Sequence, residues 1–221
     1  PMISFDYEVV EKAKHVVAIP YDGYWKDLGT WNTLTEEMDT TLMGKGIISE
    51  DSLNTHLINE LDVPVTIIGL SNIVVAISPD GILVADKAAS PRIKDLMKNI
   101  EHRMMYEERW WGWYRVLDFT HSKESLDVLT KRICILQDQH LSYHVHHMKS
   151  EIWNVISGVG EMVMNEVCTR VESGDVIRIA EGTGNGIKAI TDLEMIEIQS
   201  GSELVEEDIH RIHLGWKEVE E

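Results

Sequence analysis

Three histidines and a glutamate lie close together in the stretch LSYHVHHMKSEIWNVISG, residues 141–158. In a β-strand, residues two apart share a face, so His144 and His146 are expected to point one way and His147 the other. Glu151 follows a short turn and begins the next strand, which places a carboxylate across from the two imidazoles. Imidazole and carboxylate ligands suit Zn, Mn, Fe, Ni or Cu. The spacing therefore predicts a working metal site or the shell of one.

The strands that must position these side chains fill the C-terminal half of the sequence. Short runs rich in β-branched residues recur about every 8–12 residues, with Gly-bearing turns between them, which is typical of an antiparallel barrel or sandwich. These runs are LTKRICIL, EIWNVISG, GEMVM, GDVIRI, GIKAI and LEMIEIQSG. We therefore expect an all-β C-terminal domain.

Residues 45–87 are expected to form a small sheet or a few coils of a β-helix, with no helix among them. The runs VPVTIIGL, NIVVAI and GILVA are separated by Ser71-Asn72 and by the turn SPDG. Ser90 and Pro91 then open a predicted helix that links two domains. Its apolar residues at helical spacing are Ile93, Leu96, Met97, Ile100 and Met104.

The N-terminal residues predict two helices and one strand. Ser4 is expected to cap a helix over FDYEVVEKAK, and HVVAIP is expected to be a short buried strand ended by Pro20. The aromatic, Gly-bearing stretch YDGYWKDLG is expected to be a loop. Thr30 is expected to cap a second helix, WNTLTEEM.

Composition limits the classes of partner. The 221 residues carry a formal net charge of −18, which argues against nucleic acid as a partner. No apolar run approaches the roughly 18 residues of a membrane span, and the start of the chain lacks the pattern of a secretory leader, so we expect no membrane and a cytoplasmic location. Cys134 and Cys168 are expected to be buried free thiols. The start at Pro1 suggests a piece of a longer chain.

The spacing His-x-His, four residues, Glu, six residues, Gly resembles the first signature of the cupin family. The second signature matches GDVIRIAEGTGN, with Ala180 where proline is usual, Gly182 as expected, and Asn185 where a histidine ligand should stand. The resemblance implies a metal site of His144, His146, Glu151 and Asn185. An amide oxygen is a poor substitute for imidazole at Zn, whereas Mn or Mg would tolerate it. A functional metal and an emptied site both stay open.

A closer resemblance covers nearly the whole chain. WGWYRVLD, LTKRI, the histidine stretch, GDVIRIAEGTGNGIKAI and IEIQSGSELVEEDIHR together look like the C-terminal domain of mannose-1-phosphate guanylyltransferases, related to type II phosphomannose isomerase. The implied fold is mainly β. It would comprise the tail of a nucleotidyltransferase domain (1–43), a β-helical connector (44–90), a linker helix (91–108) and a cupin jelly-roll barrel (109–221).

In the nucleotidyltransferase tail, the resemblance implies that Asp27 of GYWKDLGTW helps to hold a divalent metal, Mg, at the nucleotide phosphates. Glu11 and Lys12 match a stretch that lines the sugar-phosphate side, although a solvated helix face is the alternative. The ligand would be a sugar phosphate or a nucleotide sugar. The family's Gly-rich phosphate loop does not occur in these residues, so we expect no guanylyl transfer by this chain alone.

Two other functions are compatible with the barrel. Isomerisation of mannose 6-phosphate would need a proton-transferring base and cations for the phosphate. Candidate phosphate contacts are Lys131, Arg132, Arg178 and Lys188, although edge-strand charges that keep the sheet soluble are a commoner role for such residues.

The third reading is a non-catalytic sugar-phosphate-binding or dimerisation module, and a homodimer is expected. The tryptophans of RWWGWYR, which are Trp110, Trp111 and Trp113, would then supply an interface. Alternatively, they would plug the barrel.

Overall fold

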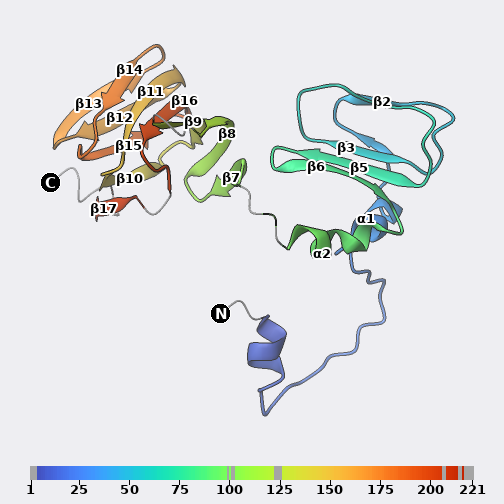
Figure 1. Cartoon of the computed structure of the whole chain (residues 1–221). Helices are drawn as coiled ribbons and strands as arrows, with labels where there is room; N and C mark the ends of the chain where they lie inside the picture. Colours follow the sequence, from blue (N-terminus) through green and yellow to red (C-terminus); the bar gives the residue numbers. More distant parts are fainter. Residues whose placement is uncertain are drawn as a thin grey trace.

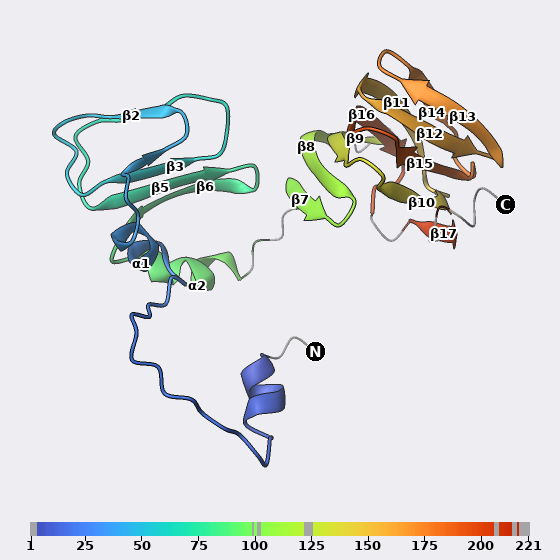
Figure 2. The same ribbon diagram turned by 180° about the vertical axis from the view of Figure 1, so that it is seen from behind.

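The computed structural model describes residues 4–98, 100, 103–121, 126–205, 208–213 and 216, and two β-rich parts follow one another along them (Figure 1). Strands β1–β6 build the first part and β7–β17 the second, with short helical segments between and before them; Figure 2 shows the same arrangement from behind. The helical segments are η1 (Asp6–Val10), α1 (Trp31–Glu36), η2 (Ser90–Arg92) and α2 (Ile93–Met97).

The N-terminal segment differs from the expectation. The predicted first helix is only the five-residue π-helix η1, although Ser4 Oγ accepts a hydrogen bond from the Tyr7 amide at 3.4 Å. The predicted strand HVVAIP is wrong, because residues 15–20 form no strand and are exposed. A strand needs a neighbour for its backbone groups, and none of the described residues pairs with this one. The predicted helix after Thr30 is present as α1.

The first β part stacks short parallel strands in the manner of β-helix coils. β3 pairs in parallel with β1 and β5, and β2 pairs in parallel with β4. Leu57 therefore lies between Leu42 and Val75, and it is fully buried with Ile67 and Ile77 around it. The strands are β1 (Leu42–Met43), β2 (Gly46–Ile48), β3 (His56–Asn59), β4 (Val65–Ile67), β5 (Ile73–Ser78) and β6 (Gly81–Asp86).

The last strand of this part, β6, folds back antiparallel on β5 through the turn predicted at SPDG. Residues 44–87 contain no helix, as expected.

The helix between the two β parts is shorter than predicted. Pro91 lies in its opening turn as expected, but α2 ends at Met97 rather than near Met104. Residues 99, 101 and 102 lie outside the described chain. The apolar positions that predicted the longer helix are exposed, since Leu96 is 68% and Met104 is 55% accessible. An amphipathic helix draws most of its stability from packing of its apolar face, and the described residues offer these side chains no such surface.

The second β part consists of two antiparallel sheets that face each other, which confirms the predicted mainly β barrel. One sheet has the strand order β14-β11-β16-β9-β8-β7, and the other has the order β13-β12-β15-β10-β17. The strands are β7 (Tyr106–Arg109), β8 (Gly112–Thr120), β9 (Asp127–Ile135), β10 (His140–Val145), β11 (Lys149–Ser157), β12 (Val159–Met164), β13 (Val167–Glu172), β14 (Val176–Ile179), β15 (Asn185–Ala189), β16 (Leu193–Gly201) and β17 (His210–His213).

The inner face of the six-stranded sheet changes from apolar to polar along its central strands. Apolar inward residues such as Trp153, Val155 and Met195 pack in the main core. Further along the same faces the inward residues are charged or polar, and they are nevertheless buried: Lys131 on β9, Lys149 and Glu151 on β11, Glu197 and Gln199 on β16. Because β11 and β16 are antiparallel and pair Glu151 with Gln199, the polar positions meet at one end of the barrel.

The two cysteines differ from each other. Cys134 is buried on β9, as predicted, and its thiol is free. The prediction of burial is wrong for Cys168, which is exposed because its strand, β13, forms the edge of its sheet. In the described part of the chain, no helix is long and apolar enough to cross a membrane.

The turn between β11 and β12 requires glycine at position 158. Gly158 has φ +89°, and a Cβ atom there would lie 2.1 Å from the Asp192 carbonyl oxygen. Gly174 also has a positive φ, +97°, but a Cβ atom there would meet nothing within 4 Å. Alanine substitutions at these two positions therefore distinguish the cost of backbone strain from the cost of a steric clash.

We expect Gly174→Ala to lower the free energy of unfolding by about 1–2 kcal/mol, because it adds backbone strain alone. Gly158→Ala should cost about 3 kcal/mol or more, because the clash with the Asp192 carbonyl is added to the strain. Urea unfolding of the two variants, followed by tryptophan fluorescence, measures the difference. Equal losses would mean that the close approach of Asp192 does not constrain the turn.

Candidate active site

A cavity of about 370 Å³ opens at the polar end of the barrel. This volume lies at the lower end of the roughly 300–1,000 Å³ usual for small-molecule sites. Its deep wall consists of buried side chains, which are Lys131, His144, His146, Lys149, Glu151, Trp153, Glu197 and Gln199. Arg109, Trp110, His140 and Arg211 also line it and are exposed or half-buried, so they form its rim.

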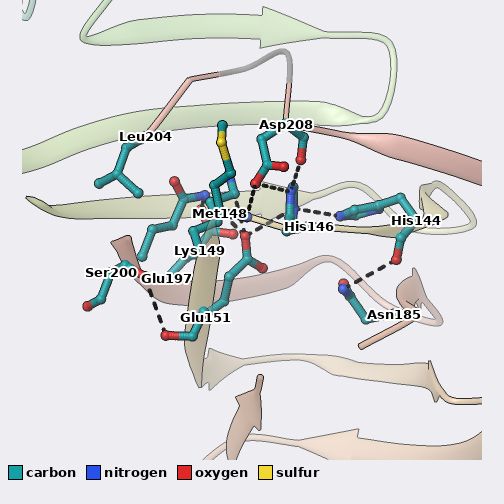
Figure 3. Close-up of polar contacts among 12 residues, drawn as sticks. His144, His146, Met148, Lys149, Glu151, Asn185, Glu197, Ser200, Leu204 and Asp208 are labelled. Carbon is teal, nitrogen blue, oxygen red and sulfur yellow. Dashed lines mark hydrogen bonds and ion pairs between the residues drawn. The ribbon is translucent and has the colours of Figure 1, made fainter. Parts of the chain in front are cut away.

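The two predicted histidines meet in this cavity. His144 lies on β10 and His146 directly follows it, and both are buried while His147 is exposed, as the alternation predicts. Their Nε2 atoms are 3.0 Å apart (Figure 3). Each Nδ1 lies within hydrogen-bond distance of a backbone carbonyl, that of Ser142 for His144 at 2.7 Å and that of Asp208 for His146. Assigning the proton to Nδ1 in both rings leaves two facing Nε2 lone pairs.

Facing lone pairs repel unless a proton or a cation lies between them. Burial lowers the pKa of His144, and burial together with Lys149 and His144 lowers the pKa of His146 to about 3. Both rings are therefore neutral at pH 7. The pair offers two nitrogen donors in the orientation that metal-binding histidines adopt, with the other ring nitrogen on a carbonyl oxygen.

Glu151 supplies the carboxyl group that the sequence predicted beside the histidines. Its Oε1 lies 3.2 Å from His146 Nε2 and 3.7 Å from Lys149 Nζ. Its Oε2 accepts a hydrogen bond from Trp153 Nε1 at 3.1 Å. Burial, and next the charge of Glu197, raise the pKa of Glu151 to about 8. The group is therefore mostly protonated at neutral pH, and it is able to donate to His146.

Gln199 joins the two buried carboxyl groups. Its Nε2 atom donates to Glu197 Oε2 at 2.9 Å and to Glu151 Oε1 at 3.3 Å. Glu197 lies directly opposite Lys131 in the β9–β16 pair, and the Lys131 Nζ atom lies 4.7 Å from the centre of the Tyr114 ring. Two acids and two lysines, Lys131 and Lys149, thus share one buried wall.

Asn185, at the fourth position of the predicted metal site, lies opposite His144 in the β10–β15 pair and is fully buried. Its Nδ2 atom donates to the Thr183 carbonyl at 3.2 Å and to the His144 carbonyl at 3.5 Å. Its Oδ1 atom has no hydrogen-bond partner among the described residues. A buried carbonyl oxygen without a partner costs about 1–3 kcal/mol, so a donor or a cation at this atom would stabilise the protein.

The side chains fit a metal ion only in part. Within the described residues, no group of three or more His, Cys, Asp or Glu side chains is arranged to hold an ion. The two imidazoles match the chemistry of a divalent metal, whereas Glu151 is engaged by Trp153 and Gln199. The donor set that converges is therefore two nitrogens.

Of the four predicted phosphate contacts, only Lys131 lines the cavity. Arg132 and Arg178 are exposed, and Arg132 pairs with Glu194 at 2.5 Å. Lys188 is half-buried and lies outside the cavity lining. Strand parity explains this separation, because Lys131 shares its face with the buried Leu129 and the neighbouring Arg132 does not.

The predicted residues of the nucleotidyltransferase tail lie apart from the barrel cavity. Asp27 is exposed, and its carboxylate accepts a hydrogen bond from the Gly29 amide at 2.7 Å. Glu11 follows η1, and the exposed Lys12 pairs with Glu8 at 2.8 Å. None of these three predicted residues lines the cavity of the barrel.

Sequence reasoning missed several residues of the site, namely Lys149, Glu197, Gln199, Asp208 and Arg211. Parity offered a signal for the first three, since Lys149 shares a face with Glu151, and Glu197 and Gln199 share one with the apolar Met195. Asp208 had no such signal. Its carboxylate accepts hydrogen bonds from the amides of His147 and Met148 at 3.0 Å each, so it fixes the chain directly after His146; Figure 3 shows Asp208 beside His146 and Met148.

Comparisons with known proteins agree with the predicted resemblance. The family model described as "Mannose-6-phosphate isomerase C-terminal" matches residues 94–214. The mannose-1-phosphate guanylyltransferase ManC of Salmonella typhimurium is 31% identical over 96% of this chain and 45% of its own length. The xanthan biosynthesis protein XanB of Xanthomonas campestris pv. campestris is 30% identical over 96% of this chain and 46% of its own length.

The chain thus spans about half the length of the curated relatives that it matches. Among solved structures, it is similar to the cupin domain of Schizosaccharomyces pombe Cnp3, with a TM-score of 0.36 and 10% identity over 55% of this chain and 77% of the other. Since the family model covers more than half of the residues, the chain belongs to the mannose-6-phosphate isomerase C-terminal family.

Proposed function

We propose that the barrel binds a hexose 6-phosphate and interconverts mannose 6-phosphate and fructose 6-phosphate. The observation that carries this proposal is the buried wall of the cavity, where two carboxyl groups, two lysines and two neutral histidines converge. Buried ionisable groups gathered in a cavity are costly for stability and are usual at catalytic sites. The family of the chain supports the same substrate.

The reaction requires a proton to move between C2 and C1 of the open-chain sugar and another to move between O1 and O2. We assign the carbon-to-carbon transfer to Glu197, which takes the C2 proton of the aldose and returns it to C1. The electron pair left at C2 forms the enediol, whose oxygens are stabilised by the ammonium groups of Lys131 and Lys149. Glu151, protonated at neutral pH, gives its proton to O1 as the enediol forms and takes the O2 proton as the ketose forms, which restores its own protonated state.

A divalent metal on the Nε2 atoms of His144 and His146 would polarise a sugar oxygen. Zn and Mn are the candidates, and Asn185 Oδ1 would be a weak neutral ligand beside them. The carboxyl and lysine groups carry the proton transfers described above.

We further propose that this chain forms part of a protein that supplies GDP-mannose in the cytoplasm. The relatives named as mannose-1-phosphate guanylyltransferases support this. In the relatives, about half of the length lies outside the match, so guanylyl transfer is proposed for a longer protein and not for these residues alone.

The isomerase proposal is tested by turnover and by one variant. We expect the chain, with Mn²⁺ or Zn²⁺ added, to convert mannose 6-phosphate into fructose 6-phosphate in a coupled assay. Glu197→Gln should lower kcat about 100-fold or more, because the amide cannot accept the C2 proton. Glu194→Gln, on the same strand but paired outward with Arg132, should leave kcat unchanged. Equal rates for Glu197→Gln and the unaltered chain would rule out the assigned base.

The pKa of Glu151 predicts a stability that falls as pH rises. In the folded chain this carboxyl keeps its proton up to about pH 8, whereas in the unfolded chain it loses it near its ordinary value of 4.5. Between these values the folded state binds more protons than the unfolded state, so the stabilisation present at low pH is lost as pH approaches 8.

We therefore expect Glu151→Gln to flatten the fall in thermal midpoint between about pH 5 and pH 8. Glu172→Gln, at an exposed carboxyl of β13, should keep the slope of the unaltered chain. The proposed protonation of Glu151 would be refuted by identical slopes for Glu151→Gln and the unaltered chain.

The two-nitrogen donor set predicts weak metal binding that a carboxylate at position 185 would strengthen. Asn185→Asp is nearly isosteric and adds a charged oxygen ligand, so we expect Mn²⁺ or Zn²⁺ to bind about tenfold tighter, equivalent to about 1.4 kcal/mol. Without metal, the variant should melt at a lower temperature, because the new charge is buried and unpaired.

Calorimetric titration and thermal unfolding, with and without metal, measure both effects. His144→Ala should remove the response to metal in either background. A metal affinity that does not change on Asn185→Asp would show that position 185 lies outside the ligand set.

A further inference from the structure

The cavity has different charges at its two ends. The deep wall holds two acids, Glu151 and Glu197, together with two lysines, Lys131 and Lys149. The rim carries two arginines, Arg109 and Arg211, and the imidazole of His140, with no carboxylate among the residues that line it. Positively charged side chains therefore lie both at the entrance and in the deep wall. The acidic groups close to each of them determine which one is able to bind a phosphate.

The deep lysines are poorly placed for a phosphate. Lys149 Nζ lies 3.7 Å from Glu151 Oε1, and Lys131 lies directly opposite Glu197. A phosphate dianion beside Lys131 would lie close to the Glu197 carboxylate in a buried, weakly screened region, where like charges repel strongly. The same carboxyl groups must reach C1 and C2 of the sugar if the proposed proton transfers occur there. The phosphate and the reacting carbons C1 and C2 therefore cannot both lie against the deep wall of the cavity.

Arg211 is placed differently. It lies on β17 directly opposite His144 of β10, and it is exposed at the mouth of the cavity. Among the described residues, no acidic side chain forms an ion pair with its guanidinium, whereas Arg109 is held by Glu107 at 2.8 Å. The His140 ring, which also lines the rim, packs 5.4 Å from Trp110 and 6.0 Å from Trp216.

We infer that Arg211, on a rim that also carries His140 and Arg109, is the phosphate-binding residue of this cavity. The inference rests on the proposed function. A guanidinium donates two parallel hydrogen bonds to phosphate oxygens, and the rim lets the dianion keep part of its hydration. The sugar then enters with its carbonyl end first, which brings C1 and C2 to Glu197 and Glu151.

This orientation determines which sugar phosphates fit. A phosphate on C6 is at the far end of the molecule from C1 and C2, so it remains at the rim while the reacting carbons lie deep. A phosphate on C1 would have to enter the carboxyl-lined end. Arg211 is therefore a specificity-determining residue that selects 6-phosphates over 1-phosphates, and the small cavity volume suits one hexose rather than a nucleotide sugar.

The test uses two ligands that differ only in the phosphate and cannot turn over because they lack a carbonyl group: 1,5-anhydromannitol 6-phosphate and 1,5-anhydromannitol. By calorimetry on the full chain, Arg211→Gln should weaken binding of the phosphorylated ligand about 10- to 100-fold and leave the other unchanged. Arg178→Gln, at an exposed arginine of β14 outside the cavity, is the matched control and should bind like the unaltered chain. Arg211→Lys, which keeps the charge but loses the fork, should lie between them.

Inorganic phosphate gives a second readout, because it should compete with the 6-phosphate ligand in the unaltered chain and compete less in Arg211→Gln. Tight binding of the 6-phosphate by a folded Arg211→Gln, or its loss in Lys131→Met alone, would overturn the inference while leaving the proposed function intact. A chain that neither binds the 6-phosphate ligand nor isomerises mannose 6-phosphate would refute the proposed function itself.

Discussion

The barrel depends on burying four ionisable groups together at one end of its inner face. An isolated charge in a protein interior costs many kcal/mol, so Lys131, Lys149, Glu151 and Glu197 are tolerated only as a set. Gln199 connects the two carboxyl groups, and the raised pKa of Glu151 lets one of them stay neutral. The apolar half of the same sheet face, around Trp153 and Met195, supplies the stabilisation that offsets this set.

The C-terminal segment completes the site from far along the chain. Leu204 packs with Val116 and Leu129, which anchors the segment against the six-stranded sheet. Asp208 then fixes the turn at His147 and Met148 and accepts the hydrogen bond of His146, and β17 delivers Arg211 opposite His144. One segment therefore orients a histidine and positions a rim arginine, which couples the deep end of the cavity to its entrance.

Local sequence patterns predict much of the barrel, because the alternation of apolar and polar residues along a strand indicates which of its faces is buried. The His-x-His spacing correctly predicted that His144 and His146 share a buried face with His147 outside. The same alternation would have placed Lys131 on the buried face and Arg132 on the exposed one. It would also have added Glu197 and Gln199 to the predicted site. Asp208 was beyond it, since its contacts with His146 and His147 are made across 62 and 61 positions in the sequence.

Two of the wrong predictions, a strand and the end of a helix, share one physical cause, because each apolar pattern lacks a packing partner. HVVAIP has the composition of a buried strand, yet its residues are exposed, and none of the described strands pairs with it. The helix predicted to reach Met104 has its apolar residues in place, but Leu96 and Met104 remain exposed and α2 ends at Met97. Intrinsic preference does not maintain either element without burial of its apolar face.

The negative net charge of the chain means that an anionic substrate depends on the cationic side chains at the rim of the cavity. With a formal net charge of −18, the chain repels a dianionic sugar phosphate over most of its surface. Attraction must therefore come from local groups whose fields are not cancelled by nearby acids, and the low-dielectric walls of a cavity concentrate such a field at its mouth. On the rim of this cavity, Arg211 forms no ion pair with an acidic side chain of the described residues, while the carboxyl groups that line the cavity lie deeper. That order, with cations first and acids behind them, suits a substrate whose anionic end and reacting end are at opposite ends of a hexose.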